Sequence, residues 1–153
     1  MMTHSPQRGF TLLVAVILAS VALSIGLALL DIAYKQVVLA SSARQSQNAF
    51  YNADAVLECA LYWDQTQNSF RYTDTSSSIS ITCGGQPITV TFTNPPSGTR
   101  TRTFTMPCSG GGTSGSATIT KQSDATTNIF ASGYNTCDDS HTRRIERGLK
   151  VIY

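Results

Sequence analysis

The chain has 153 residues and a formal net charge of +2, and 41% of its residues are hydrophobic. This length allows one modest domain, and so small a net charge excludes the strongly basic or acidic composition of a chain built mainly for charged partners. The hydrophobic residues concentrate before residue 40, which leaves a Ser/Thr/Gly-rich remainder with a thin core. A small domain of that kind needs stabilisation besides hydrophobic burial.

An apolar segment runs from Phe10 to Leu30 without a charged residue. At a rise of about 1.5 Å per residue, a helix over this segment is about 30 Å long and matches the hydrocarbon core of a bilayer. The apolar region of a signal peptide is shorter, at roughly 7–15 residues. The segment therefore predicts a single helix, residues 10–30, that spans a bilayer, with the short leader around Arg8 in the cytoplasm.

The helix is expected to continue over residues 31–63, because neither proline nor glycine interrupts this stretch. Its apolar residues recur in steps of three and four, which is typical of a helix with one buried stripe. These residues are Val38, Ala49, Phe50, Ala53, Val56, Leu57, Ala60 and Leu61. We therefore expect an amphipathic second half that packs against protein on one side.

The pattern changes to period two after Trp63, with many β-forming residues. Six short strands are predicted, at 77–83, 87–94, 101–107, 116–122, 128–134 and 144–153. Short connections rich in turn residues favour antiparallel neighbours. The expected fold class is α+β, with the long helix packed on a small antiparallel sheet domain over residues 64–153.

Four cysteines, Cys59, Cys83, Cys108 and Cys137, follow the membrane segment. An even number in a small domain outside the cytoplasm favours disulfides, whereas a zinc site is disfavoured because no C-x-x-C pair is present. Four cysteines allow three connectivities, and the sequence alone cannot choose among them. The prediction adopted here is Cys59–Cys83, joining the helix end to the first strand, and Cys108–Cys137, closing the glycine-rich loop.

A histidine, His141, lies directly after Asp138, Asp139 and Ser140. Neighbours in sequence rarely reach the geometry of a nucleophile, a base and an orienting group, so a solvated turn is the favoured interpretation. Calcium binding at the two aspartates stays open, although the alternating oxygen ligands of a dedicated loop are absent. We expect no enzymatic activity, no cofactor and no small-molecule substrate.

Five arginines could form a basic patch if their strands adjoin, as a DNA-binding surface would need. Strand alternation splits them between two faces, and Glu146 dilutes their charge, so a solvated sheet face is favoured and nucleic acid is the less favoured partner. The five are Arg100, Arg102, Arg143, Arg144 and Arg147.

The start of the chain carries the most specific motif, RGFTLL, in which Gly9 and Phe10 precede the apolar helix. With its basic leader, long helix and small β domain, the chain resembles the type IV pilins and pseudopilins. The resemblance implies that a leader peptidase removes residues 1–9 by cleaving after Gly9 and methylates the amine of Phe10. It also implies that the retained helix leaves the inner membrane to pack against other pilin subunits in a filament at the bacterial surface.

One position departs from the family pattern. Val14 occupies the fifth mature position, where most members carry a glutamate that neutralises the amine of a neighbouring subunit. Minor pilins and the tip pseudopilin of type II secretion lack this glutamate, and the segments SQNAFYNADAVLECALYWD and RRIERGLKVIY are similar to PilX-like minor pilins. The resemblance thus implies a minor pilin or tip pseudopilin that primes or modulates filament assembly near the tip. The alternative is a singly anchored adhesin or a DNA-binding module of the same filament system.

Overall fold

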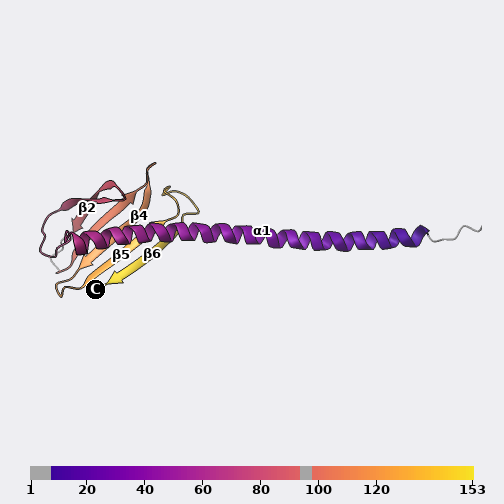
Figure 1. Cartoon of the computed structure of the whole chain (residues 1–153), viewed down its shortest axis with the longest axis horizontal. Helices are drawn as coiled ribbons and strands as arrows, with labels where there is room; N and C mark the ends of the chain where they lie inside the picture. Colours follow the sequence, from indigo (N-terminus) through magenta and orange to yellow (C-terminus); the bar gives the residue numbers. More distant parts are fainter. Residues whose placement is uncertain (1–7, 94–97) are drawn as a thin grey trace, which may run out of the picture. The chain divides into compact units, whose positions relative to one another are not determined.

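The computed structural model describes residues 8–93 and 98–153, with side chains from Phe10 onward. One long helix, α1 (Arg8–Leu61), begins the described chain and ends in a π-helical turn, η1 (Tyr62–Thr66). The chain divides into two units, which we call the N-terminal unit (Met1–Ser42) and the C-terminal unit (Ala43–Tyr153). Helix α1 therefore contributes to both units (Figure 1).

The N-terminal unit presents its side chains to the surroundings, because every residue from Phe10 to Ser42 is exposed. Two hydroxyls within the apolar stretch bond back to helix carbonyls: Ser20 Oγ donates to Ile17 O, and Ser24 Oγ donates to Ser20 O, both at 2.8 Å. These bonds satisfy the hydroxyls without a water molecule, which suits an apolar environment.

The C-terminal unit contains a six-stranded antiparallel sheet in the order β1-β2-β3-β4-β5-β6, so that neighbours in sequence are neighbours in the sheet. The strands are β1 (Ser78–Cys83), β2 (Gln86–Thr93), β3 (Arg100–Pro107), β4 (Thr113–Lys121), β5 (Thr127–Tyr134) and β6 (Glu146–Ile152). The predicted α+β class and the meander of six strands are both confirmed.

The last turns of α1 pack on one face of this sheet, where small residues let the backbones approach closely (Figure 1). Ala49 and Ala53 of the helix are fully buried. A Cβ added at Gly133 of β5 would overlap the helix backbone at these two alanines, and one added at Gly115 of β4 would lie 2.7 Å from Val56 Cγ2. Glycine at these strand positions therefore sets the depth of the helix on the sheet.

The core begins later in the helix than the periodicity predicted. Val38 is 50% exposed, and the first fully buried helix residue is Ala49. The C-terminal unit starts at Ala43, so the last third of α1 belongs to the same unit as the sheet. From Ala49 onward most of the predicted stripe is buried, but Phe50 is 46% exposed, and before Ala43 no described residue covers the apolar side chains.

Candidate functional site

The most extensive exposed apolar feature is the stretch of α1 between Phe10 and Leu39, exposed on all sides, which we call the apolar helix surface. Phe10 is 73% exposed, and the exposed large apolar residues continue past Leu30. The helix is long and apolar enough to cross a membrane, as predicted. Residues 1–7 of the predicted leader lie outside the described residues. Gly9 and Phe10, between which the leader peptidase is expected to cut, lie within α1.

Val14 lies on this surface with 37% of its area exposed. Its isopropyl group offers no carboxylate to a neighbouring amine. Within the described part of α1, Asp31 is the first acidic residue, and its Oδ2 is already paired with Lys35 Nζ at 2.7 Å. The first five turns of the apolar helix surface therefore present no negative charge.

Both predicted disulfides are present. Cys59 in α1 is bonded to Cys83 at the end of β1, with their Cα atoms 5.9 Å apart. Cys108 after β3 is bonded to Cys137 after β5, with their Cα atoms 6.1 Å apart. Gly112 is required beside the second disulfide, because its φ is +80° and an added Cβ would overlap the carbonyl group of Cys137. The two crosslinks fix the helix end and the glycine-rich loop to the sheet.

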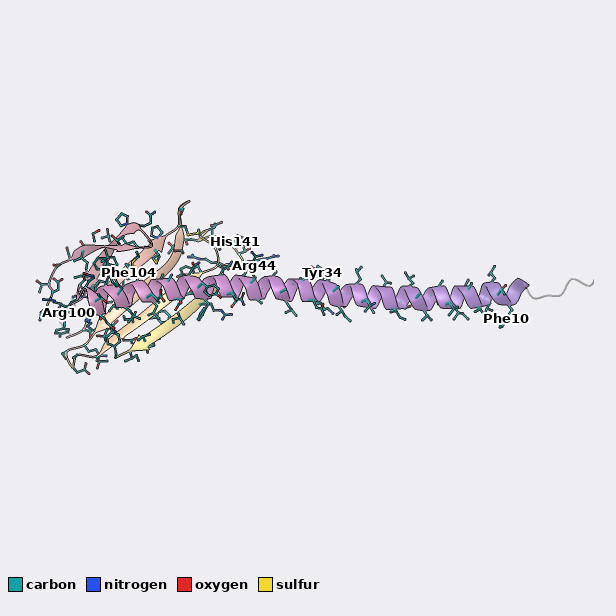
Figure 2. All side chains as sticks on the ribbon, viewed as in Figure 1. Phe10, Tyr34, Arg44, Arg100, Phe104 and His141 are labelled. Carbon is teal, nitrogen blue, oxygen red and sulfur yellow. A yellow bond between two sulfur atoms is a disulfide. The ribbon has the colours of Figure 1, made fainter. Side chains whose placement is uncertain are left out.

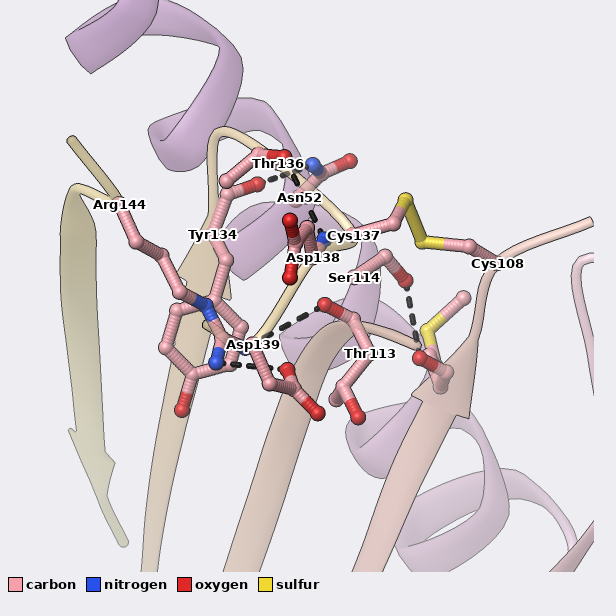
Figure 3. The surroundings of a disulfide bond; sticks show 11 residues. Asn52, Cys108, Thr113, Ser114, Tyr134, Thr136, Cys137, Asp138, Asp139 and Arg144 are labelled. Carbon is pink, nitrogen blue, oxygen red and sulfur yellow. Dashed lines mark hydrogen bonds and ion pairs between the residues drawn. A yellow bond between two sulfur atoms is a disulfide. The ribbon is translucent and has the colours of Figure 1, made fainter. Parts of the chain in front are cut away.

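The predicted turn at residues 138–141 uses its polar groups locally; Figure 3 shows one of these contacts, between Asp139 and Arg144. Asp138 Oδ1 accepts bonds from Ser140 Oγ at 2.6 Å and from Ser140 N at 2.9 Å, and these bonds lower the pKa of Asp138. Asp139 Oδ1 pairs with Arg144 Nη1 at 2.6 Å. His141 Nδ1 accepts the backbone N–H of Arg143 at 3.1 Å. The two carboxylates thus serve different partners, and the imidazole nitrogen that could act as a base is engaged with the main chain.

The five arginines proposed for a basic patch do not come together. Arg100 in β3 is opposite Lys121 at one end of the sheet, whereas Arg147 in β6 is opposite Gly133 at the other end. Figure 2 shows the same separation between Arg100 and His141, which lies in the loop of Arg143 and Arg144. Six residues along β3 separate the two ends, a distance of about 20 Å at the rise of a strand. The five arginines therefore do not share one exposed surface in the described part of the chain.

Arg102 is buried as well as displaced. Only 1% of its area is exposed, and its guanidinium lies 3.9 Å from the centre of the Phe92 ring. Its Nη2 donates to the carbonyl oxygens of Arg71 at 3.2 Å and Asp74 at 3.1 Å. Burial lowers the pKa of Arg102, and the nearby Asp74 opposes this effect. This arginine fastens the loop after α1 to the sheet, so the solvated sheet face favoured from the sequence does not hold for Arg102.

Arg144 and Arg147 are likewise occupied by structural contacts. The guanidinium of Arg144 lies 3.7 Å from the centre of the Tyr134 ring (Figure 3). Arg147 Nε donates to Ser46 Oγ at 2.8 Å and so links β6 to α1. These contacts explain the residues without a nucleic-acid partner.

A polar cluster of Lys121 and Tyr153 around the buried Asp64 was missed by the sequence reasoning. The Asp64 side chain is 3% exposed; Lys121 Nζ lies 2.7 Å from its Oδ1, and Tyr153 Oη donates to its Oδ2 at 2.5 Å. Burial, followed by the bond to Asp64, raises the pKa of Tyr153. Two features of the sequence could have indicated the cluster: Asp64 directly follows the amphipathic stripe, and Lys121 lies on the inward-facing side of β4. The three residues come from η1, β4 and the end of β6, so only the folded register brings them together.

Comparisons with models of known protein families, with curated proteins and with solved structures give no match.

Proposed function

We propose that this chain is a minor subunit of a type IV filament, either a minor pilin or a tip pseudopilin, with a structural rather than a catalytic role. The observation that carries the proposal is the apolar helix surface, which opens at the Gly9–Phe10 junction and continues without a helix break into a disulfide-linked sheet unit. Such a helix serves as a membrane anchor first and as a packing element afterwards.

The length of the apolar helix surface favours a filament subunit over a singly anchored adhesin. A helix from Phe10 to Leu39 is about 45 Å long, whereas the hydrocarbon core of a bilayer is about 30 Å thick. Beyond Leu30 the surface includes charged residues, Asp31 and Lys35, among exposed apolar ones. Those apolar residues are Ile32, Tyr34, Val37, Val38 and Leu39. Helices of neighbouring subunits would cover them, and lipid alone would not.

The DNA-binding alternative is the weaker proposal. It requires clustered arginines on one exposed surface, and the structure separates Arg100 from Arg147 and buries Arg102. The adhesin alternative differs from the leading proposal in processing, since an adhesin needs no cut after Gly9.

Mass spectrometry of the chain isolated from cells with the leader peptidase tests the proposal. The expected mature chain begins with N-methylphenylalanine at Phe10. A Gly9→Leu variant should keep the leader, because a bulky side chain before the cut obstructs entry of extended backbone into the protease site. An intact start at Met1 in the wild-type chain, or a cut after Leu30, would overturn the filament proposal.

Val14 bears on the abundance of the subunit. A filament built wholly from this chain would repeat an uncompensated amine in an apolar core, which costs several kcal/mol for each unpaired charge. We therefore expect the chain to be scarce in sheared filaments measured by quantitative mass spectrometry, and its deletion to reduce filament number. Val14→Glu should raise its share, with Val16→Glu as the matched control that places a carboxylate elsewhere on the helix. Near-equimolar abundance of the wild-type chain with the main subunit would contradict a minor role.

A further inference from the structure

The two edges of the sheet differ in how they are protected. At the β1 edge, the indole Nε1 of Trp63 donates to the carbonyl oxygen of Thr82 at 3.0 Å, and the Cys59–Cys83 disulfide holds α1 beside the same strand. At the other edge, β6 pairs with β5 only, and no second strand borders it within the described part of the chain. The β6 edge is therefore the one available for strand pairing.

The hydrogen-bond pattern identifies the main-chain groups at this edge. Tyr153 and Thr127 exchange both of their backbone bonds, at 2.7 and 3.0 Å, and Asn135 N donates to Ile145 O at 3.1 Å. Bonding residues alternate along an antiparallel strand, so residues 147, 149 and 151 also face β5. The N–H and C=O groups of the alternate residues point away from the sheet. These alternate residues are Glu146, Gly148, Lys150 and Ile152.

We propose that a second copy of this chain pairs with this edge, β6 against β6 in antiparallel orientation, with Gly148 opposite Gly148 of the second copy. In this register Glu146 lies opposite Lys150 of the second copy, and Lys150 lies opposite its Glu146. The two-fold symmetry thus produces two ion pairs from one strand sequence, as an isologous interface requires. Opposite charges directly across an antiparallel pair stabilise it.

The charges select this register over its neighbours. Moving the strands so that residue 147 or 149 lies on the two-fold axis places Glu146 opposite Gly148 or Ile152, and neither ion pair forms. Moving further places Glu146 opposite Glu146, or Lys150 opposite Lys150, and like charges directly opposite are destabilising. Glu146 and Lys150 therefore disfavour pairing with unrelated strands but allow pairing with a second copy of β6.

A hollow on the helix side of the sheet fits the same arrangement. It has a volume of about 270 Å³ and is bordered by Ser46, Gln47, Phe50, Tyr51 and Arg147. Phe50 and Tyr51 are 46% and 66% exposed, and their rings meet edge to face at 6.2 Å. In the proposed register, Leu149 of the second copy lies opposite Arg147, on the same side of the sheet. Leu149 packs partly against the core of its own copy, and its remaining exposed surface would border the hollow beside Arg147.

Register-specific crosslinking of the full chain tests the proposal. Glu146→Cys and Lys150→Cys variants carrying different tags are mixed in detergent and oxidised gently, with intact masses checked for the native disulfides. Opposed residues of such a pair have Cα atoms about 5.5 Å apart, which a disulfide accepts, whereas two copies of residue 146 are about 15 Å apart. We expect a crosslinked dimer in the mixture, and at least tenfold less from either variant alone. The Ser80→Cys variant, exposed at the β1 edge, is the matched control.

Charge exchange provides the second readout. Glu146→Lys or Lys150→Glu alone should weaken association about tenfold, and the double variant should restore it, because the ion pairs re-form with reversed polarity. Absence of a crosslink in the mixture, equal crosslinking of each variant alone, or a double variant as weak as the singles would overturn the proposal. The pairing involves the C-terminal unit only, so it is independent of processing at Gly9, which the mass of the mature chain reports separately.

Discussion

The buried cluster at the end of the helix yields the sharpest prediction for stability. Replacing Tyr153 by phenylalanine removes the bond from its hydroxyl to Asp64 Oδ2 and leaves the ring in place. Lys121 remains to compensate the carboxylate. A hydrogen bond to a charged group contributes about 1.5–3 kcal/mol, and we take the lower part of that range because Tyr153 is 44% exposed. The free energy of unfolding should therefore fall by about 1–2 kcal/mol at pH 7.

The raised pKa of Tyr153 gives the same variant a distinct dependence on pH. Below about pH 10 the phenol is protonated in both the folded and the unfolded chain, so its contribution is fully present. Above that pH the unfolded chain releases the proton while the folded chain retains it, and stability falls by about 1.4 kcal/mol per pH unit. The Tyr153→Phe variant has no phenol hydroxyl to ionise, so its stability does not fall with pH for this reason. The stability difference between the two proteins should therefore shrink as the pH rises above 10.

Denaturation of the full chain in detergent can be followed by tryptophan fluorescence, because the chain has one tryptophan and Trp63 bonds to the sheet at Thr82. Tyr62→Phe is the matched control: its hydroxyl accepts from Gln67 Nε2, and the residue is half exposed. We expect that control to change stability by less than about 0.5 kcal/mol. An unchanged stability of Tyr153→Phe at pH 7, together with an alkaline profile parallel to the wild type, would refute the reasoning.

Two further substitutions probe the packing of the C-terminal unit by the same fluorescence assay. Gly133→Ala should lower the free energy of unfolding by about 3 kcal/mol or more, because the added methyl group meets the helix backbone at Ala49. The control Gly110→Ala places its methyl group in open space and should have little effect. Equal effects of the two substitutions would contradict the close helix packing. Arg102→Gln should lower the free energy of unfolding by about 2–4 kcal/mol, because it removes two hydrogen bonds to carbonyl oxygens and the contact with Phe92. A melting temperature equal to that of the wild type would show that the buried guanidinium does not stabilise the fold.

Much of the fold could be predicted because local patterns and global structure agree. Period two marked all six strands to within three residues, and short turn-rich connections implied the meander. Both disulfides match the pairing adopted above, although three connectivities were open: one joins the end of α1 to β1, and the other joins the segments after β3 and β5. The start of the buried stripe could not be located, because an apolar residue such as Val38 has the same spacing whether a sheet, a lipid or another subunit covers it.

The arginines show where sequence reasoning is weakest. Alternation along one strand is a local property, but the distance between Arg100 and Arg147 depends on the register across four strands. Asp64 and Tyr153 are 89 residues apart and meet for the same reason. Long-range polar contacts require the register, whereas hydrophobic periodicity is local.

The two disulfides stabilise the C-terminal unit independently of whether the apolar helix surface is covered. Their cysteines are 24 and 29 residues apart in sequence, and closing loops of that size in the unfolded chain stabilises the fold by about 3.5 kcal/mol each in the chain-entropy model. Both crosslinks lie beyond Ala43, and so does every residue of the buried core. The unit therefore has its own sources of stability while Phe10 to Leu39 remain exposed. In the proposed filament function, such a chain would fold while its helix is anchored in a membrane, and the free energy of covering that helix would remain available for assembly.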